Sequence, residues 1–165
     1  MINSRSLLDR YDAAMQVYTA DCTSNPSVWH RPNVAEFMEL YGLLIPYAEA
    51  GEICCQYALA TILWLGLCCE SEEKFHTTLA SAKEKATRWW IAAAKQGYWP
   101  ALDNLVSTGV GKEAELAREA WHKLERERPD LVGFANGMPI YGDEFVQELS
   151  RRMYDRVIVD TNNLH

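Results

Sequence analysis

Cysteines are the first residues in this chain whose type and spacing could do chemistry, because thiolates bind zinc and act as nucleophiles. The 165-residue chain has five cysteines, and four of them form the adjacent pairs Cys54-Cys55 and Cys68-Cys69. Within one predicted helix, Cys54 and Cys68 would lie about 21 Å apart. One zinc ion cannot bridge that distance with bonds of about 2.3 Å. Buried, reduced cysteines are therefore the favoured interpretation, and we expect neither a metal nor another cofactor.

Histidines and carboxylates offer further pairs for acid–base chemistry. His122 and Glu125 lie one helical turn apart, a spacing that is also common on solvated helix faces. Cys69 and His76 are neighbours in sequence, but only a histidine close in space would activate a cysteine. Carboxylates of neighbouring predicted helices could also meet, namely Glu36, Glu39, Glu49 and Glu52.

Motifs for phosphate loops, dinucleotide binding, nucleophile elbows and zinc proteases do not occur in the sequence. We therefore predict no catalytic residues and a protein that is not an enzyme. The alternative is an enzyme whose site is not visible in the sequence. A deep pocket holding carboxylates with strongly shifted pKa values would favour that alternative.

The charge of the chain bears on its partners. The net charge is −7, which argues against binding to duplex nucleic acid, because that needs a basic stripe. Residues 1–69 carry three basic against seven acidic side chains, whereas residues 70–130 are close to neutral. The acidic first part could attract a basic protein, or it could serve solubility alone.

Targeting signals are not visible in the sequence. Residues 1–9 lack the apolar core of a secretory signal, and no apolar run is long enough to cross a bilayer. The odd number of cysteines does not suggest the disulfide framework of a small secreted protein. We therefore expect a cytoplasmic protein without membrane contact.

Helices must position all of these residues. Apolar residues recur every three to four positions in segments that we predict as helices: 6–20, 33–48, 52–67, 80–96, 99–107, 112–127 and 144–157. Pro46 is expected to kink the second helix or split it. Residues 132–143 are rich in glycine and proline and are expected to be irregular, and no strand is expected. The sum is an all-α chain of about seven helices, packed as antiparallel pairs.

The stretch 85–97 has the most regular helical spacing. Three residues share one face of the predicted helix, namely Ala86, Trp89 and Ala93. Gly97 stands where a helix commonly ends, and a similar segment ends at Gly51, 46 residues earlier. After each glycine a small residue and a leucine follow at equal distances: Cys55 and Leu59, then Ala101 and Leu105. Such a unit cannot bury its face alone and normally recurs.

These residues resemble the Sel-one-like repeat family, which is enriched in bacteria and related to the tetratricopeptide repeat. The second half of the family pattern, Lys-Ala-x-x-Trp-x-x-x-Ala-Ala-x-x-Gly, is matched in full by residues 85–97. Its first half, a small residue, Leu, an aromatic residue and Gly, is matched by residues 55–66, with Cys55 in place of Ala and Leu63 in place of the aromatic residue. The resemblance covers about residues 40–128 and implies a short α/α solenoid within a single domain, 1–165. The segments outside it, 1–32 and 129–165, would be non-repeat helical caps.

The spacing of 46 exceeds the usual repeat of about 36 residues, so the extra residues fall within 68–80. We predict a loop there. It either carries function or is an ordinary solvated connection between helices.

The resemblance implies a non-enzymatic protein–protein interaction module, since such repeats present helix faces and loops to other proteins. We expect a stoichiometric binder of one protein partner. An immunity-type protein that neutralises a basic toxin and a generic adaptor or regulator both stay open, and so does the oligomeric state. The candidate contact residues are Trp90, Tyr98, Trp99, Glu36, Glu39, Glu52, Glu72, Glu73 and Phe75. For Trp90 the alternative is burial against a neighbouring helix.

Overall fold

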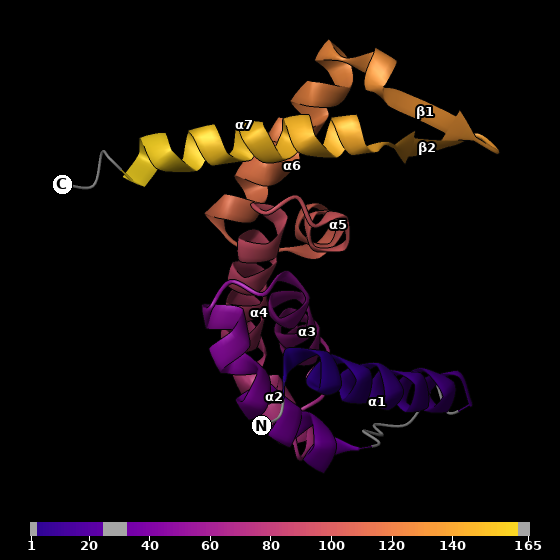
Figure 1. Cartoon of the computed structure of the whole chain (residues 1–165), viewed down its shortest axis with the longest axis vertical. Coiled ribbons are helices and arrows are strands. Elements are labelled where there is room, and N and C mark those ends of the chain that lie inside the picture. The colour runs from indigo at the N-terminus through magenta and orange to yellow at the C-terminus, as the bar shows by residue number, and fades with distance from the viewer. Residues whose placement is uncertain (1–2, 25–32, 162–165) are drawn as a thin grey trace. The chain divides into compact units, whose positions relative to one another are not determined.

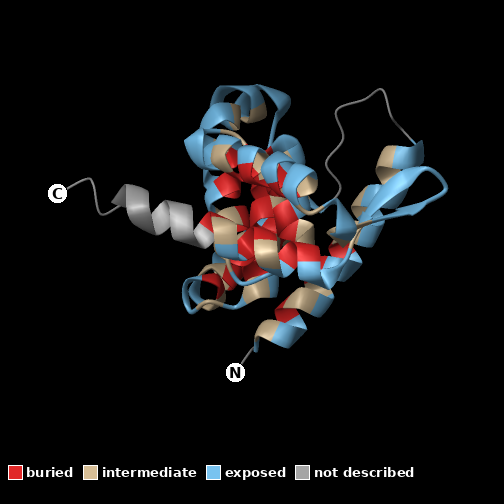
Figure 2. Cartoon of the chain, turned by 90° about the horizontal axis from the view of Figure 1, so that it is seen from above, coloured by how far each residue is buried: buried red, intermediate tan, exposed pale blue. Residues whose placement is uncertain are grey.

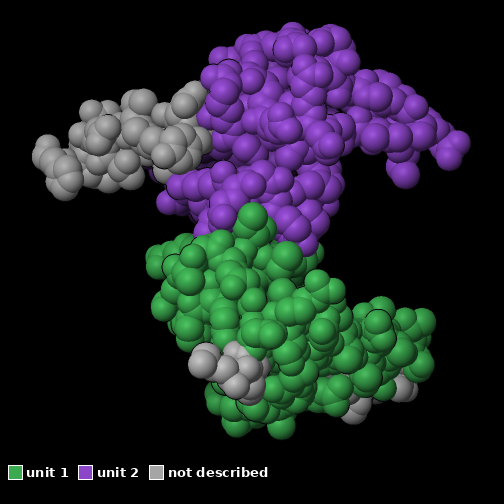
Figure 3. All heavy atoms as spheres, in the orientation of Figure 1, with its two compact units in different colours: residues 1–89 green, residues 90–165 purple. Residues whose placement is uncertain are grey.

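The computed structural model of the chain describes residues 3–24 and 33–161, of which 154–161 are described by their backbone alone. The described residues form seven α-helices, one 3-10 helix and one two-stranded sheet (Figure 1). The prediction of an all-α protein is confirmed, with the small sheet as an addition, and the solenoid arrangement stays a prediction. The chain divides into two compact units, residues 1–89 and 90–165 (Figure 3). The boundary between them falls inside one helix.

The first unit contains α1 (Ser4–Ser24), α2 (Val34–Glu49), α3 (Ile53–Trp64) and most of α4 (Glu72–Ala94). At the start of α1, the side chain of Asn3 accepts a 2.9 Å hydrogen bond from the Ser6 N–H, as expected of a helix cap. The core is built from buried residues of α1, α2 and α3. It includes Leu7, Tyr11, Ala14, Phe37, Leu40, Leu44, Ala48, Cys55, Leu59 and Ile62. Residues 25–32 lie outside the described part of the chain.

Helix α2 runs through Pro46 to Glu49 as one element, so the predicted split does not occur. Proline normally disrupts a helix through its ring and through the hydrogen bond that it cannot donate. Leu44 and Ala48 on either side of Pro46 are buried, so packing holds the helix together at this point.

Two helix ends 46 residues apart share one backbone geometry. Gly51 and Gly97 both have positive φ, 96° and 81°, which favours glycine. In each, the N–H groups of the glycine and of the next residue donate to carbonyls three and five residues earlier. The four bonds, 2.9 to 3.2 Å long, join Gly51 to Ala48, Glu52 to Tyr47, Gly97 to Ala94 and Tyr98 to Ala93. This is the Schellman motif, so the two stretches that the sequence paired end in the same way.

The predicted loop at 68–80 is wrong from residue 72 onward, because α4 already begins at Glu72. The Ser71 side chain accepts a hydrogen bond from the Lys74 N–H at 3.2 Å, and Glu72 and Glu73 place negative charge at the helix N-terminus. Both features stabilise a helix start. The extra residues therefore lengthen a helix and leave only a short connection after α3.

The second unit contains the end of α4, then α5 (Trp99–Thr108), α6 (Lys112–Glu127), a 3-10 helix (Pro129–Leu131), β1 (Val132–Ala135), β2 (Met138–Tyr141) and α7 (Asp143–Thr161). Most of its buried residues lie on the helices. Figure 2 colours the buried residues of the chain red. The large, fully buried side chains of this unit include Trp90, Leu102, Leu105, Leu124 and Phe145.

A β-hairpin replaces the irregular segment that the sequence predicted at 132–143, so the expectation of no strand is wrong. Strands β1 and β2 pair in antiparallel register, with Val132 opposite Tyr141 and Ala135 opposite Met138. Asn136 and Gly137 connect them with positive φ at both positions, 53° and 78°. This is the type I′ turn, for which Asn-Gly is the preferred pair. Asn136-Gly137 is thus a hairpin signal that the prediction of an irregular segment did not use.

Candidate protein-interaction surface

Exposed apolar side chains gather on the hairpin. Phe134, Met138 and Ile140 are 73%, 70% and 51% exposed. Residues 131–142 contain no charged side chain, and the hairpin projects beyond the ends of α6 and α7 (Figure 1). Exposed apolar patches on soluble proteins commonly mark sites of contact with another molecule. We call residues 132–141 the apolar hairpin.

Both faces of the apolar hairpin are apolar. The register places four residues on one face, namely Val132, Phe134, Pro139 and Tyr141, and four on the other, namely Gly133, Ala135, Met138 and Ile140. Antiparallel sheets usually keep one polar face toward water. This hairpin has no such face, so either side can bury apolar surface against a partner.

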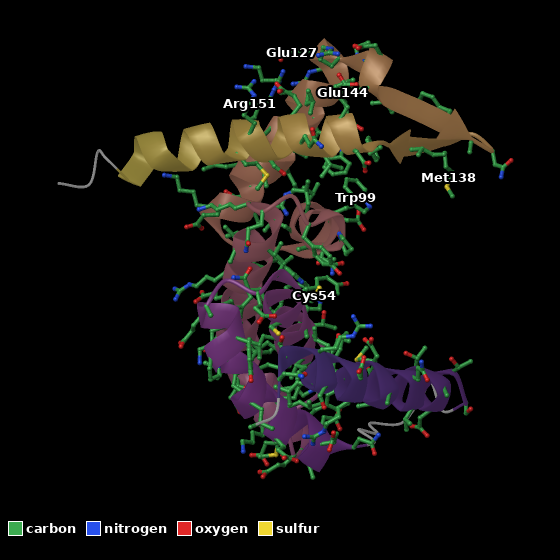
Figure 4. The ribbon with its side chains drawn as sticks, viewed as in Figure 1. Cys54, Trp99, Glu127, Met138, Glu144 and Arg151 are labelled. Carbon is green, nitrogen blue, oxygen red and sulfur yellow. The ribbon has the colours of Figure 1, made fainter. Side chains whose placement is uncertain are left out.

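The base of the hairpin is held by a group of aromatic rings. The Tyr141 ring lies 4.5 Å from that of Trp121, 4.7 Å from that of Phe145 and 5.8 Å from that of Trp99, measured between ring centroids. These partners come from α6, α7 and α5, so three helices hold one end of the ribbon. Trp99 lies just below the hairpin base, and Met138 lies on the projecting part (Figure 4). The rings add packing energy of about 0.5–1.5 kcal/mol per pair to area burial.

A carboxylate strengthens the same junction. The Tyr141 hydroxyl donates to Oε1 of Glu125 at 2.5 Å, and Nδ1 of His122 lies 3.1 Å from Oε2. Burial raises the pKa of Glu125, but the hydrogen bonds from Tyr141 and His122 outweigh it and lower the pKa overall. Burial and the bond to Glu125 raise the pKa of Tyr141. Glu125 is thus held as an ionised acceptor and Tyr141 as a neutral donor, which suits a structural link.

Ion pairs join α6 to α7 beside this junction. Arg152 lies 2.7 Å from Glu127 on α6 and 2.7 Å from Glu148 on its own helix. Arg151 also donates to Glu148, at 2.8 and 2.9 Å. The bonds from the two arginines hold the pKa of Glu148 at about 2. Figure 4 labels Glu127 and Arg151 on the side of α7 away from Trp99.

The acidic residues predicted as contacts divide into two groups. Glu36 and Glu39 on α2 both bind Arg10 of α1, at 2.8 and 3.0 Å, so one arginine offsets part of their charge. The others are exposed at helix starts, namely Glu52, Glu72 and Glu73. The sequence could not pair Glu36 and Glu39 with Arg10, because the arginine lies more than 25 positions earlier, on another helix.

The aromatic residues that were predicted as partner contacts differ in how far their side chains are buried. Trp90 is only 2% exposed, so the prediction of a surface role is wrong for this side chain and the alternative, burial, applies. Adjacent residues on a helix point about 100° apart, and the spacing alone did not show which indole faces the core. Tyr98 and Trp99 are half-buried, and Trp99 belongs to the hairpin base. Phe75 is half-buried and lies over Gly66.

The cysteines of the first unit differ in exposure. Cys55 is buried, and burial raises the pKa of its thiol to about 11, whereas the adjacent Cys54 is exposed. Within residues 3–24 and 33–153, no group of three or more Cys, His, Asp or Glu side chains lies close enough to hold a metal ion. No helix in the described part of the chain combines the length and apolar character needed to cross a membrane.

The apolar hairpin is the surface that sequence reasoning missed. Asn136-Gly137 within an uncharged run was the signal that could have found it. Comparison of the chain with protein families, with curated proteins and with solved structures gave no match.

Proposed function

We propose that this protein is a non-enzymatic protein–protein interaction module that binds one partner stoichiometrically, with the apolar hairpin as its main contact surface. The observation that carries the proposal is the exposure of Phe134, Met138 and Ile140 on a ribbon that has no polar face. Phenylalanine and methionine are enriched at protein interfaces, where a few buried side chains supply most of the binding energy. The anchored base supports the proposal, because a contact element that is already ordered loses little entropy on binding.

The helices that precede the hairpin in the sequence support the same class of function. The matching ends at Gly51 and Gly97 are what a repeat of the Sel-one-like type would require, and we keep membership of that family as a proposal. Such repeats serve as rigid surfaces for other proteins. An immunity-type role in the cytoplasm, with a basic toxin as partner, fits the exposed carboxylates Glu52, Glu72 and Glu73.

The experiment is affinity capture from the native cell with the protein tagged at its C-terminus, followed by mass spectrometry. The test variant is the double substitution Phe134→Ser with Met138→Ser. The control is Val17→Ser, which removes an apolar side chain that is 49% exposed on α1. We expect one stoichiometric partner that is retained by the control and lost by the hairpin variant. Retention of the same partner by both variants would contradict the proposal.

A further inference from the structure

The two free edges of the apolar hairpin differ in their hydrogen-bonding capacity. A two-residue type I′ turn makes the flanking pair, Ala135 and Met138, a hydrogen-bonded pair. Bonded and non-bonded pairs alternate in an antiparallel ladder. Phe134 opposite Pro139 is therefore a non-bonded pair, and the main-chain groups of both residues point outward, away from the other strand.

The outer edge of β2 is blocked. Its central outward position is Pro139, which has no N–H to donate to a further strand. Proline at such a position is one way in which proteins prevent edge-to-edge pairing.

The outer edge of β1 is open. Phe134 presents both an N–H and a C=O group on this side, and no strand lies beside it in the two-stranded sheet. Val132 presents its C=O, while its N–H already donates to the carbonyl of Pro129. The edge therefore offers one donor and two acceptors to an incoming strand.

We propose that β1 pairs antiparallel with β1 of a second copy of this chain, with Gly133 facing the partner's Gly133 across a two-fold axis. In this register the Phe134 N–H donates to the carbonyl of the partner's Val132, and the reciprocal bond forms on the other side of the axis. These two bonds use only groups that the structure leaves open, and neither needs the occupied Val132 N–H. The product is a four-stranded sheet, which is more stable than an isolated two-stranded ribbon.

The chemistry of the edge favours a second copy as the occupant. The segment 131–142 carries no charge, so two copies meet without like-charge repulsion along the strands. Gly133 at the axis brings no two side chains into contact at the closest approach of the strands. Pro139 then occupies both outer edges of the combined sheet, so the assembly closes at two copies and does not grow into a filament.

The inference rests on the proposed function in one respect, that the hairpin is a protein-contact element. It adds the edge of the ribbon as a second contact, distinct from the two faces. Those faces stay available to another protein in the dimer.

The first test is sedimentation equilibrium of the purified full chain and of two variants at one position. Phe134→Pro removes the outward N–H, and Pro139 shows that the ribbon accepts proline at an outward position. Phe134→Val keeps the N–H and loses only the ring. We expect a wild-type dimer, a dissociation constant raised about tenfold or more by Phe134→Pro, and a smaller rise for Phe134→Val. Circular dichroism checks that both variants are folded.

The second test is a disulfide across the proposed axis. In a non-bonded antiparallel pair the Cα atoms are about 4.5 Å apart, within the range for a disulfide. A Cβ at Gly133 would meet only Ile140, at 3.7 Å, so Gly133→Cys fits. In a Cys54→Ser background, we expect Gly133→Cys to form a disulfide-linked dimer under mild oxidation. Ala135→Cys is the matched control, because its two copies would lie about 14 Å apart in this register.

Two results would overturn the inference. One is a wild-type chain that stays monomeric up to about 100 µM, a concentration well above the dissociation constant of a stable dimer. The other is a dimer that Phe134→Pro leaves unchanged and that Gly133→Cys does not cross-link. The capture experiment separates these failures from that of the proposed function. A monomer that still loses its partner on Phe134→Ser with Met138→Ser overturns the dimer alone.

Discussion

The Tyr141 hydroxyl donates a 2.5 Å hydrogen bond to Glu125 and so ties the last residue of β2 to the last turn of α6. The same tyrosine ring touches aromatic side chains of α5, α6 and α7. One residue therefore joins the hairpin to three helices through both a polar bond and ring packing. The exposed part of the ribbon starts directly beyond this junction.

Tyr141→Phe should lower the free energy of unfolding by about 1–2 kcal/mol, because it removes a hydrogen bond to a charged group and keeps the ring. Tyr141→Ala should cost more, since it also removes the ring contacts. Urea unfolding measures both. In a double-mutant cycle, Glu125→Gln should reduce the effect of Tyr141→Phe. Equal effects of Tyr141→Phe in the two backgrounds would show that the bond contributes nothing.

Gly66→Ala should destabilise the first unit by at least about 2 kcal/mol, since alanine is strained at positive φ and its Cβ would overlap the Phe75 ring. Gly42→Ala is the matched control. It lies inside α2 with nothing near its Cβ position, so alanine should stabilise the protein by about 0.5–1 kcal/mol. Thermal melts of the two variants should shift in opposite directions. A shift of the same sign in both variants would show that overlap with the Phe75 ring does not determine the stability of Gly66→Ala.

The ion pairs of Glu148 make stability depend on pH. The folded-state pKa of Glu148 is depressed to about 2 from 4.5, so its stabilising contribution is complete above the ordinary value. That contribution is lost as the pH falls from about 4.5 toward about 2, because protonation then favours the unfolded chain. Glu148→Gln should lower the urea midpoint at pH 6 and leave it nearly unchanged at pH 2.5. An equal loss at both pH values would mean that packing, and not charge, is responsible.

Cys54 should react with a thiol reagent at pH 8 far faster than Cys55, although the two are adjacent. Cys54 is exposed, whereas Cys55 is buried and burial raises the pKa of its thiol to about 11. The thiolate is the reactive form, so both access and charge protect Cys55. Mass mapping after brief alkylation identifies the labelled residue, and Cys54→Ser should abolish the fast phase. Fast labelling of Cys55 would indicate that α3 opens locally.

Periodicity predicted the helices wherever an apolar stripe and clear end signals occurred together. Helix α6 begins at Lys112 and ends at Glu127, as predicted, because Gly111 and Pro129 flank it and its small and apolar residues recur on one face. The start of α4 was missed because residues 72–79 are mostly polar and show no stripe. Their capping chemistry at Ser71 was the usable signal.

The sequence predicted single residues of the candidate site but not how the fold brings them together. Trp99 was identified as a contact residue from its position after Gly97, but its role at the hairpin base depends on Tyr141, more than 40 positions later. The choice between Trp89 and Trp90 depends on which helix face meets the core, and that is settled by tertiary packing. The apolar hairpin needed the turn chemistry of Asn136-Gly137 to be weighed above the general tendency of glycine and proline to end helices.

Helix α4 runs without interruption from Glu72 to Ala94, and the boundary between the two units falls between Trp89 and Trp90. Trp89 packs against the core of the first unit, and the buried Trp90 belongs to the second. Helix formation is cooperative, so fraying of α4 in one unit removes turns that the other depends on. We therefore expect the two units to melt in a single cooperative transition. Trp89 would report on the unfolding of the first unit and Trp90 on that of the second, at the same temperature.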